Sequence, residues 1–234
     1  MGRTVVVGDV HGCADELARL LALVKFAEGT DRVVLVGDLV VRGPDPHGVL
    51  AVVRRLGARA ARGNHEAKLL AWKQKGKPLG PDHERVAKAL SPDEWRLLES
   101  LPLWIDLPEH GARVVHAGVV PGVDVEDAPE EALLKMRTID ARGRWSDEPD
   151  AGQLWGATYE GPPHVVFGHN ARREPQLHAW ATGLDTGCVY GGRLTGLVLD
   201  EGEAVPRGDL VATRLKSVGA RRSYYGDNGG PLSR

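Results

Sequence analysis

Three apolar runs near the amino terminus constrain the fold more than any other feature of this sequence. They are TVVVG at 4–8, RVVLVG at 32–37 and a short alanine-rich run near 58–61. Residues 15–26, 46–56 and about 66–75, which separate and follow these runs, carry apolar side chains at helical spacing. This alternation of strand and helix predicts a parallel sheet whose strands are joined by right-handed crossovers.

The rest of the chain mixes predicted helices with predicted strands. SPDE at 91–94 has the pattern of a capping box at a helix start. Residues 101–119 predict a hairpin that turns around Glu109–Gly111, and HVVFGH at 164–169 predicts another buried strand. No periodicity is visible from residue 214 onward, so we expect one domain over residues 1–213 and a loosely ordered tail over 214–234. The predicted architecture is two packed sheets, partly parallel and partly antiparallel, with helices outside.

Charge and cysteine content argue against several classes of protein. The formal net charge of −2 creates no field that would draw the chain to nucleic acid or to an anionic membrane. No apolar run approaches the ~18 residues of a membrane span. The two cysteines are too few for a disulfide framework and fit reducing surroundings. We therefore expect a cytoplasmic protein with no membrane segment and no stable binding to nucleic acid.

Polar side chains follow the ends of five predicted strands. The carboxyl ends of parallel strands meet at one edge of a sheet, so we expect these side chains to converge. They suit a pair of divalent ions bridged by Asp38, since mixed imidazole and carboxylate donors favour Mn²⁺ first, with Fe, Co²⁺ or Zn²⁺ possible. A hydroxide held between two such ions attacks phosphorus, so the pattern predicts a metal-dependent phosphohydrolase. The candidate metal ligands are Asp9, His11, Asp38, Asn64, His116 and His169.

The motifs that contain these residues resemble a known family. GDVHG, GDLVVRGP, GNHE, HAG and GHN, in this order over about residues 4–200, are similar to the motifs of calcineurin-like metallophosphoesterases, in the branch that includes serine/threonine protein phosphatases. The resemblance implies an α/β fold, a four-layer α/β/β/α sandwich with mixed parallel and antiparallel sheets. It also implies one metal held by Asp9, His11 and Asp38, and a second held by Asp38, Asn64, His116 and His169.

The same resemblance implies roles for residues that face the substrate. His65 matches the family's proton donor to the leaving group, and Arg42 and Arg62 match arginines that hold the phosphate. LDTGCVYGGRLTGL at 184–197 is similar to the last strands of the diadenosine tetraphosphatase subgroup, and KMRT at 135–138 makes Arg137 a candidate for substrate contact. The implied substrate is diadenosine tetraphosphate or a related small-molecule nucleotide, with a phosphoprotein as the alternative.

One departure from the family pattern bears on substrate choice. Protein phosphatases have an aspartate that pairs with the catalytic histidine at the position where this chain has Val41. Val41 can neither orient nor charge His65. A polyphosphate leaving group is a weak base and needs less help from a proton donor than a serine alkoxide does. We therefore expect phosphoanhydrides to be cleaved in preference to phosphoserine, unless another acid such as Asp45 replaces the missing aspartate.

Several alternatives stay open at this stage. The chain could be a serine/threonine-type protein phosphatase, an RNA-end phosphatase or a non-catalytic module that binds a phosphorylated ligand, although no expected ligand is missing. Cys13 and Arg19 have the spacing of a cysteine-dependent phosphatase loop, but the intervening Asp15 and Glu16 would repel phosphate. The remaining histidines are expected to be surface or packing residues: His47, His83, His110, His164 and His178.

Overall fold

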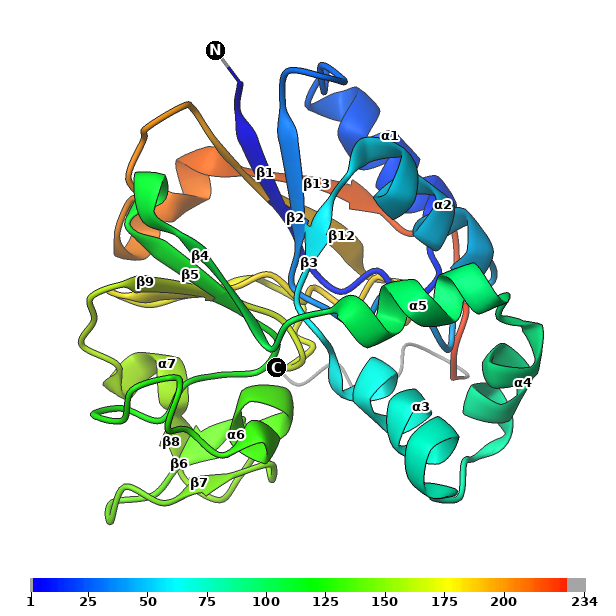
Figure 1. Cartoon of the computed structure of the whole chain (residues 1–234). Coiled ribbons are helices and arrows are strands. Elements are labelled where there is room, and N and C mark those ends of the chain that lie inside the picture. Colours follow the sequence, from blue (N-terminus) through cyan, green and yellow to red (C-terminus); the bar gives the residue numbers. More distant parts are fainter. Residues whose placement is uncertain (1, 227–234) are drawn as a thin grey trace.

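The structure is a computed structural model in which residues 2–226 are described. Figure 1 shows the course of the chain from β1 at the amino terminus to β13. Two 3-10 helices accompany the α-helices, η1 (Pro108–His110) and η2 (Gly208–Arg214). The α-helices are α1 (Ala14–Leu23), α2 (Pro46–Leu56), α3 (Asn64–Lys75), α4 (Pro81–Ala89), α5 (Pro92–Ser100), α6 (Glu130–Lys135) and α7 (Trp155–Thr158). The strands are β1 (Thr4–Val7), β2 (Arg32–Leu35), β3 (Arg59–Ala60), β4 (Trp104–Leu107), β5 (Ala112–Val115), β6 (Thr138–Ile139), β7 (Trp145–Ser146), β8 (Gln153–Leu154), β9 (His164–Phe167), β10 (Gln176–Leu177), β11 (Ala181–Gly183), β12 (Arg193–Leu199) and β13 (Leu215–Gly219).

The first sheet contains the three strands that the amino-terminal alternation predicted. Its order is β13-β12-β1-β2-β3, and β1, β2 and β3 run parallel to one another. Strand β12 pairs antiparallel with β1. The helices predicted between the strands are α1 and α2, and α2 ends at Gly57, whose φ of 58° gives the left-handed turn expected of a helix stop.

The second sheet has the order β10-β11-β9-β5-β4. Strands β4 and β5 form the predicted antiparallel hairpin, which turns through η1 and Gly111. Strands β5, β9 and β11 run parallel. A small third sheet, β7-β6-β8, lies beside α6 and α7 (Figure 1).

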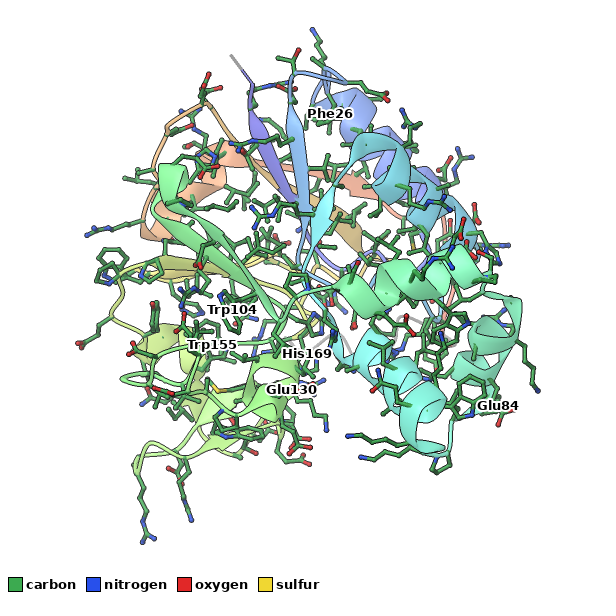
Figure 2. The ribbon with its side chains drawn as sticks, viewed as in Figure 1. Phe26, Glu84, Trp104, Glu130, Trp155 and His169 are labelled. Carbon is green, nitrogen blue, oxygen red and sulfur yellow. The ribbon has the colours of Figure 1, made fainter. Side chains whose placement is uncertain are left out.

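Three separate hydrophobic clusters establish the layering. Neighbouring residues of β1 point to opposite faces of the first sheet, because side chains alternate along a strand: Val5 and Val7 join a cluster with the helices α1, α2, α3 and α5, whereas Val6 joins a cluster between the two sheets. The outer face of the second sheet packs Phe167 against Trp155 of α7 and against α6. Figure 2 labels Phe26 just beyond the end of α1 and Trp155 on the opposite side of the molecule. Three interfaces define four layers, so the predicted α/β/β/α sandwich is confirmed.

The carboxyl-terminal segment differs from the prediction of a loose tail starting at residue 214. Residues 215–219 form β13, which pairs antiparallel with β12 from Leu197 opposite Leu215 to Arg193 opposite Gly219. The Tyr224 hydroxyl then donates a hydrogen bond to Glu16 of α1 at 2.9 Å. The prediction was wrong for these residues because a short edge strand has too few side chains to show a period, and its partner lies elsewhere in the chain. Residues 227–234 of the predicted tail lie outside the described residues.

Among residues 2–226, no helix combines the length and the apolar character that crossing a lipid bilayer requires.

Candidate metal centre and phosphate site

The candidate metal ligands meet at the carboxyl ends of the parallel strands in both sheets. Asp9 and His11 follow β1, Asp38 follows β2, and Asn64 opens α3 directly after β3. His116 follows β5, and His169 follows β9, two segments that come from the second sheet. Figure 2 labels His169 at the junction between the second sheet and the helical side of the molecule. The convergence that the strand-end pattern predicted is what the structure contains.

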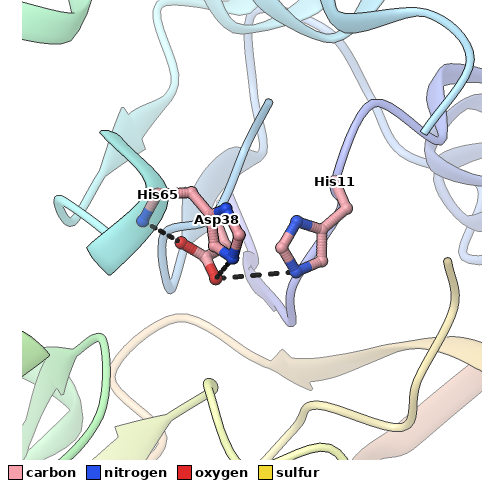
Figure 3. A group of neighbouring side chains, drawn as sticks. All are labelled: His11, Asp38 and His65. Atoms are coloured by element: carbon pink, nitrogen blue, oxygen red, sulfur yellow. Dashed lines mark hydrogen bonds and ion pairs between the residues drawn. The ribbon is translucent and has the colours of Figure 1, made fainter. Parts of the chain in front are cut away.

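Asp38 occupies the middle of this cluster. Its Oδ2 lies 3.4 Å from His116 Nε2 and 3.5 Å from His11 Nε2. Among the described residues, three groups of donor atoms, each within 4.8 Å of one another, could hold a metal ion, and Asp38 belongs to two of them: one contains His11 and His65, and the other contains His116 and His169. Figure 3 shows His11 and His65 on either side of the Asp38 carboxylate. A carboxylate in this position is suited to bridge two ions.

Asn64 and Asp9 complete the cluster from two sides. Asn64 Oδ1 lies 2.9 Å from His116 Nε2 and 2.9 Å from His169 Nδ1. Asp9 accepts the backbone N–H of His169, at 3.0 Å from Oδ2 and 3.2 Å from Oδ1. All six predicted ligands therefore lie in one cluster.

The three imidazoles of the cluster share one arrangement. In each, one ring nitrogen lies beside a backbone carbonyl oxygen, and the other faces the cluster. The carbonyl is that of Val40 for His11 (3.4 Å), of Val36 for His116 (3.1 Å) and of Lys135 for His169 (3.0 Å). Metal-ligating histidines commonly use their second nitrogen in this way, because a carbonyl acceptor fixes the tautomer and the ring orientation.

The pKa shifts in the cluster show that its buried carboxylates favour a positive charge beside them. Burial and the neighbouring Asp185 carboxylate raise the pKa of Asp9 well above its usual range, and burial raises the pKa of Asp185 to about 6. Burial alone would lower the pKa of His116, but the Asp38 carboxylate outweighs it and raises that pKa to about 9. Three buried carboxylates and three oriented imidazoles need cations between them, so the donor set fits two divalent metal ions.

Glu66 holds the loop that carries Asp38. It is fully buried in the first turn of α3, and its carboxylate accepts four backbone N–H groups. Oε2 accepts from Asp38 at 2.9 Å and Gly63 at 3.0 Å, and Oε1 accepts from Leu39 at 3.0 Å and Val40 at 3.2 Å. Burial and then the Asp38 carboxylate raise the pKa of Glu66 to about 7. Glu66 thus ties the β2 loop to the start of α3 and fixes the distance between Asp38 and Asn64.

Backbone conformation also concentrates strain at this centre. Non-glycine residues with positive φ are uncommon, and between residues 2 and 226 all of them but Lys25 belong to loops of the cluster. Val41 has a φ of 71°, which is costly for a β-branched residue. Such strain persists where the surrounding structure over-determines it, as it does at many functional sites. The remaining residues with positive φ in these loops are His11, Asp38, Arg42 and His169.

His65 differs from the three oriented imidazoles. Its backbone N–H donates to Asp38 Oδ1 at 3.1 Å, and its Nδ1 lies 3.0 Å from Nε2 of His83. The two rings are nearly parallel, at 4°. His83 was expected to be a packing or surface residue, and the structure instead makes it the ring partner of His65. Asp45, the acid considered as a substitute partner, caps α2 by accepting the Gly48 N–H at 2.8 Å.

A cavity of about 350 Å³ opens over the cluster. Arg42 and Arg137 both line it, and Arg42 Nη1 lies 3.4 Å from His11 Nε2. The Arg42 guanidinium lies 5.5 Å from the ring centre of Tyr190 and 5.2 Å from that of Tyr225, which stabilises it by cation–π attraction. Two arginines and the cluster therefore face one space of a size that admits a nucleotide phosphate.

Of the three arginines predicted to contact phosphate, Arg62 is the one that does not line this cavity. Its guanidinium Nη2 donates to the Glu99 carbonyl at 3.4 Å, near the end of α5. Adjacent to the GNHE motif in sequence, Arg62 leaves the strand on the side that faces α5, whereas Asn64 turns into the cluster. The contact between Arg62 and phosphate therefore stays a prediction, which would require the Arg62 side chain to move from α5 toward the cavity.

Asp185, Tyr190 and His83 are site residues that the sequence interpretation did not assign. A signal for Asp185 was available: it follows β11, a strand parallel to β9, and so repeats the pattern of a polar residue at a strand end. His83 and Tyr190 had no such signal, because each reaches the site from an element whose position depends on tertiary packing.

Buried carboxylates and imidazoles at strand ends, an arginine-lined cavity and a four-layer sandwich are together the features of a metal-dependent phosphoesterase. The sequence of residues 2–192 matches the family of calcineurin-like phosphoesterases. The chain therefore belongs to this family, as the motifs predicted.

Several relatives carry a more specific name. The chain is 32% identical to the symmetrical bis(5'-nucleosyl)-tetraphosphatase of Chromohalobacter salexigens, over 86% of this chain and 96% of that protein. It is 31% identical to the protein of the same name from Vibrio campbellii, over 82% and 93%. A crystal structure of a proposed diadenosine tetraphosphatase is 38% identical and superposes with a TM-score of 0.82 over 94% of both chains. A serine/threonine phosphatase from Saccharomyces cerevisiae, 17% identical with a TM-score of 0.62 over 93% of this chain and 79% of its own, shares the fold.

Proposed function

We propose that this protein hydrolyses dinucleoside polyphosphates, diadenosine tetraphosphate foremost. The observation that carries the proposal is the cavity of about 350 Å³ in which the metal-ligand cluster, Arg42 and Arg137 face the same space. Its relatives named bis(5'-nucleosyl)-tetraphosphatase match more than four-fifths of the chain. A substrate with a chain of phosphates suits a site that combines cations with two arginines.

The proposed metal ligands are the six clustered residues, with Asp38 shared between two ions and Mn²⁺ as the first candidate. When bound, two such ions lower the pKa of water so that it can attack phosphorus, and they neutralise the charge of the attacked phosphate. Carboxylate and imidazole donors together support this choice over an all-oxygen site for Ca²⁺ or Mg²⁺.

The chain's own residues would position the substrate and assist the leaving group. Arg42 is stabilised by two neighbouring tyrosine rings and lines the same cavity as Arg137, so both guanidinium groups can donate paired hydrogen bonds to phosphate oxygens. One water is consumed, one P–O–P bridge breaks, and the departing phosphate oxygen is stabilised by a proton or a hydrogen bond from His65 Nε2. His65 can fill this role because its Nδ1 is engaged by His83.

Val41 supports a phosphoanhydride substrate over a phosphoprotein. It is buried beside the site and cannot pair with His65, and Asp45 is occupied as a helix cap. Burial, together with the nearby His11 and Arg42, keeps the pKa of His65 well below its usual range, although the Asp38 carboxylate opposes this. A neutral His65 can still hydrogen-bond to a weakly basic polyphosphate, but it is a poor proton donor to a serine alkoxide.

The proposed surroundings are the cytoplasm, where both cysteines would stay reduced. Cys13 and Cys188 are buried free thiols, which is compatible with a reducing compartment.

Product analysis tests the proposed function. The purified protein with Mn²⁺ is given diadenosine tetraphosphate, and the products are separated by ion-exchange chromatography. Two ADP molecules per substrate are expected, as the name of the symmetrical relatives describes. Asp38→Asn is expected to lose at least about a hundredfold in kcat, because it removes the bridging charge. Turnover of a phosphoserine peptide that exceeds turnover of the dinucleotide would refute the proposal.

A further inference from the structure

A second cavity, of about 380 Å³, adjoins the first. The two share Arg42, Asn64 and His65, which form the boundary between them. The first cavity extends toward Arg137 and His169, whereas the second extends between α3 and α4 toward Lys68 and His83. The candidate metal centre thus has a separate space on each side.

The charged side chains that line the second cavity favour the binding of an anion. Arg42 and Lys68 line it against a single carboxylate, that of Asp82. Lys68 is exposed on α3 and forms no ion pair with any residue between 2 and 226. Its charge is therefore not neutralised by the protein and is available to a ligand.

Aromatic surface accompanies this charge. Tyr225 lines the second cavity but not the first, and 36% of its surface is exposed. Its ring lies 5.2 Å from the Arg42 guanidinium and next to the ring of Tyr190, with the two tyrosine ring centres 6.2 Å apart. A nucleotide has an anionic phosphate at one end and an aromatic base at the other. A cationic side chain beside an exposed aromatic ring can therefore contact both parts of it.

The position of His65 decides which half of a dinucleotide would occupy this cavity. His65 is the proposed donor to the departing oxygen, and it lies on the wall toward α4, where its Nδ1 contacts His83. His83 lines only the second cavity, whereas His169 lines only the first. A departing group within reach of His65 therefore lies on the α3–α4 side of the attacked phosphorus.

We propose that the second cavity binds the departing nucleoside diphosphate, with Lys68 holding its phosphate and Tyr225 bordering its nucleoside. This inference rests on the proposed hydrolysis of dinucleoside polyphosphates and assigns one half of that substrate to a site of its own. The other nucleotide occupies the cavity that Arg137 lines.

The test compares two substrates that share a reacting phosphate but differ in what departs. The enzyme with Mn²⁺ is assayed on diadenosine tetraphosphate, whose departing group is a nucleotide, and on p-nitrophenyl phosphate, whose departing group has no phosphate. Lys68→Ala is expected to lower the ratio of the two kcat/KM values about tenfold, the size of a charge-assisted hydrogen bond to phosphate at a partly exposed site. Lys68→Arg is expected to recover most of the ratio.

Lys75→Ala is the matched control, because Lys75 ends the same helix, is exposed and lines neither cavity. It removes the same charge and is expected to leave the ratio within twofold of wild type. Equal ratios for Lys68→Ala and Lys75→Ala would overturn the inference.

Inhibition of p-nitrophenyl phosphate hydrolysis separates this inference from the proposed function. If the wild type does not cleave diadenosine tetraphosphate, the proposed function fails, and the inference is then judged from inhibitors. Lys68→Ala should raise the inhibition constant of ADP about tenfold while changing that of inorganic phosphate less than twofold, since phosphate alone does not reach the second cavity. An unchanged constant for ADP would contradict the inference in that case.

Discussion

Gly63→Ala is expected to displace Asp38 in the candidate metal centre. The backbone conformation at Gly63 is one that any residue can adopt, so the effect comes from the space that an added Cβ would need. Gly63 precedes α3 with φ −86° and ψ 169°. An ideal Cβ there would lie 2.1 Å from Asp38 Oδ1 and 2.3 Å from the Asp38 backbone nitrogen. Because one of these atoms belongs to the backbone, restoring normal contact requires a shift of about 1 Å in the loop that carries Asp38.

Two costs follow from that shift. Forced overpacking typically destabilises by 1–3 kcal/mol, and the hydrogen bonds from Asp38 and Gly63 to Glu66 would be stretched as well, so we expect a loss of about 3 kcal/mol. In a chain of this length that loss lowers Tm by about 6–12 °C. A displacement of about 1 Å in a catalytic group can cost about a hundredfold in rate, so kcat on p-nitrophenyl phosphate should fall by that order.

Gly80→Ala is the matched control for stability. Gly80 precedes α4 with the same φ of −86° and ψ of 169°, but a Cβ there would meet nothing within 4 Å. The two substitutions therefore change the unfolded chain equally and differ only in crowding. Thermal unfolding followed by circular dichroism should separate them by at least 5 °C. Equal Tm values, or a Gly63→Ala enzyme within threefold of wild-type kcat, would show that Asp38 is not held in the way described.

Three further outcomes follow from other parts of the molecule. Val41→Asp should lower the kcat/KM ratio of diadenosine tetraphosphate over a phosphoserine peptide, because it places a carboxylate beside the proton donor; an unchanged ratio would mean that Val41 does not set this preference. Burial alone would raise the pKa of Asp31, but the Arg3 guanidinium and backbone N–H groups outweigh it and lower that pKa to about 2. Because the folded-state pKa lies below the unfolded one, Asp31→Asn should cost at most about 2 kcal/mol at pH 7, and in urea titrations the difference should vanish as the pH falls from about 4 through 2. EDTA should abolish hydrolysis and iodoacetamide should not, since Cys13 and Cys188 are buried; the reverse pattern would indicate cysteine chemistry.

Much of the fold could be predicted from local patterns. The three parallel strands, the hairpin around Glu109–Gly111 and the capping box at Ser91 each depend on side chains only a few residues apart. The short strand β13 could not be found in this way, because its register is set by β12 rather than by a period of its own.

The candidate metal centre was predictable for a related reason. Asp38, Asn64 and His169 each lie within a few residues of a strand end, and parallel strands bring their carboxyl ends to one edge whatever the loops do. The order of strands therefore determined which residues would meet, and the structure supplies the distances between them.

Tertiary packing decided the surroundings of that centre. His83 reaches His65 because α4 packs beside α3, and Tyr225 reaches Arg42 because β13 pairs with β12 and carries the chain back to the site. Arg62 stands next to a predicted ligand pair in sequence, yet it bonds to α5. A sequence pattern specifies contacts that the backbone period imposes, whereas contacts between elements depend on the balance of packing across the whole chain. The walls of the two cavities belong to the second kind.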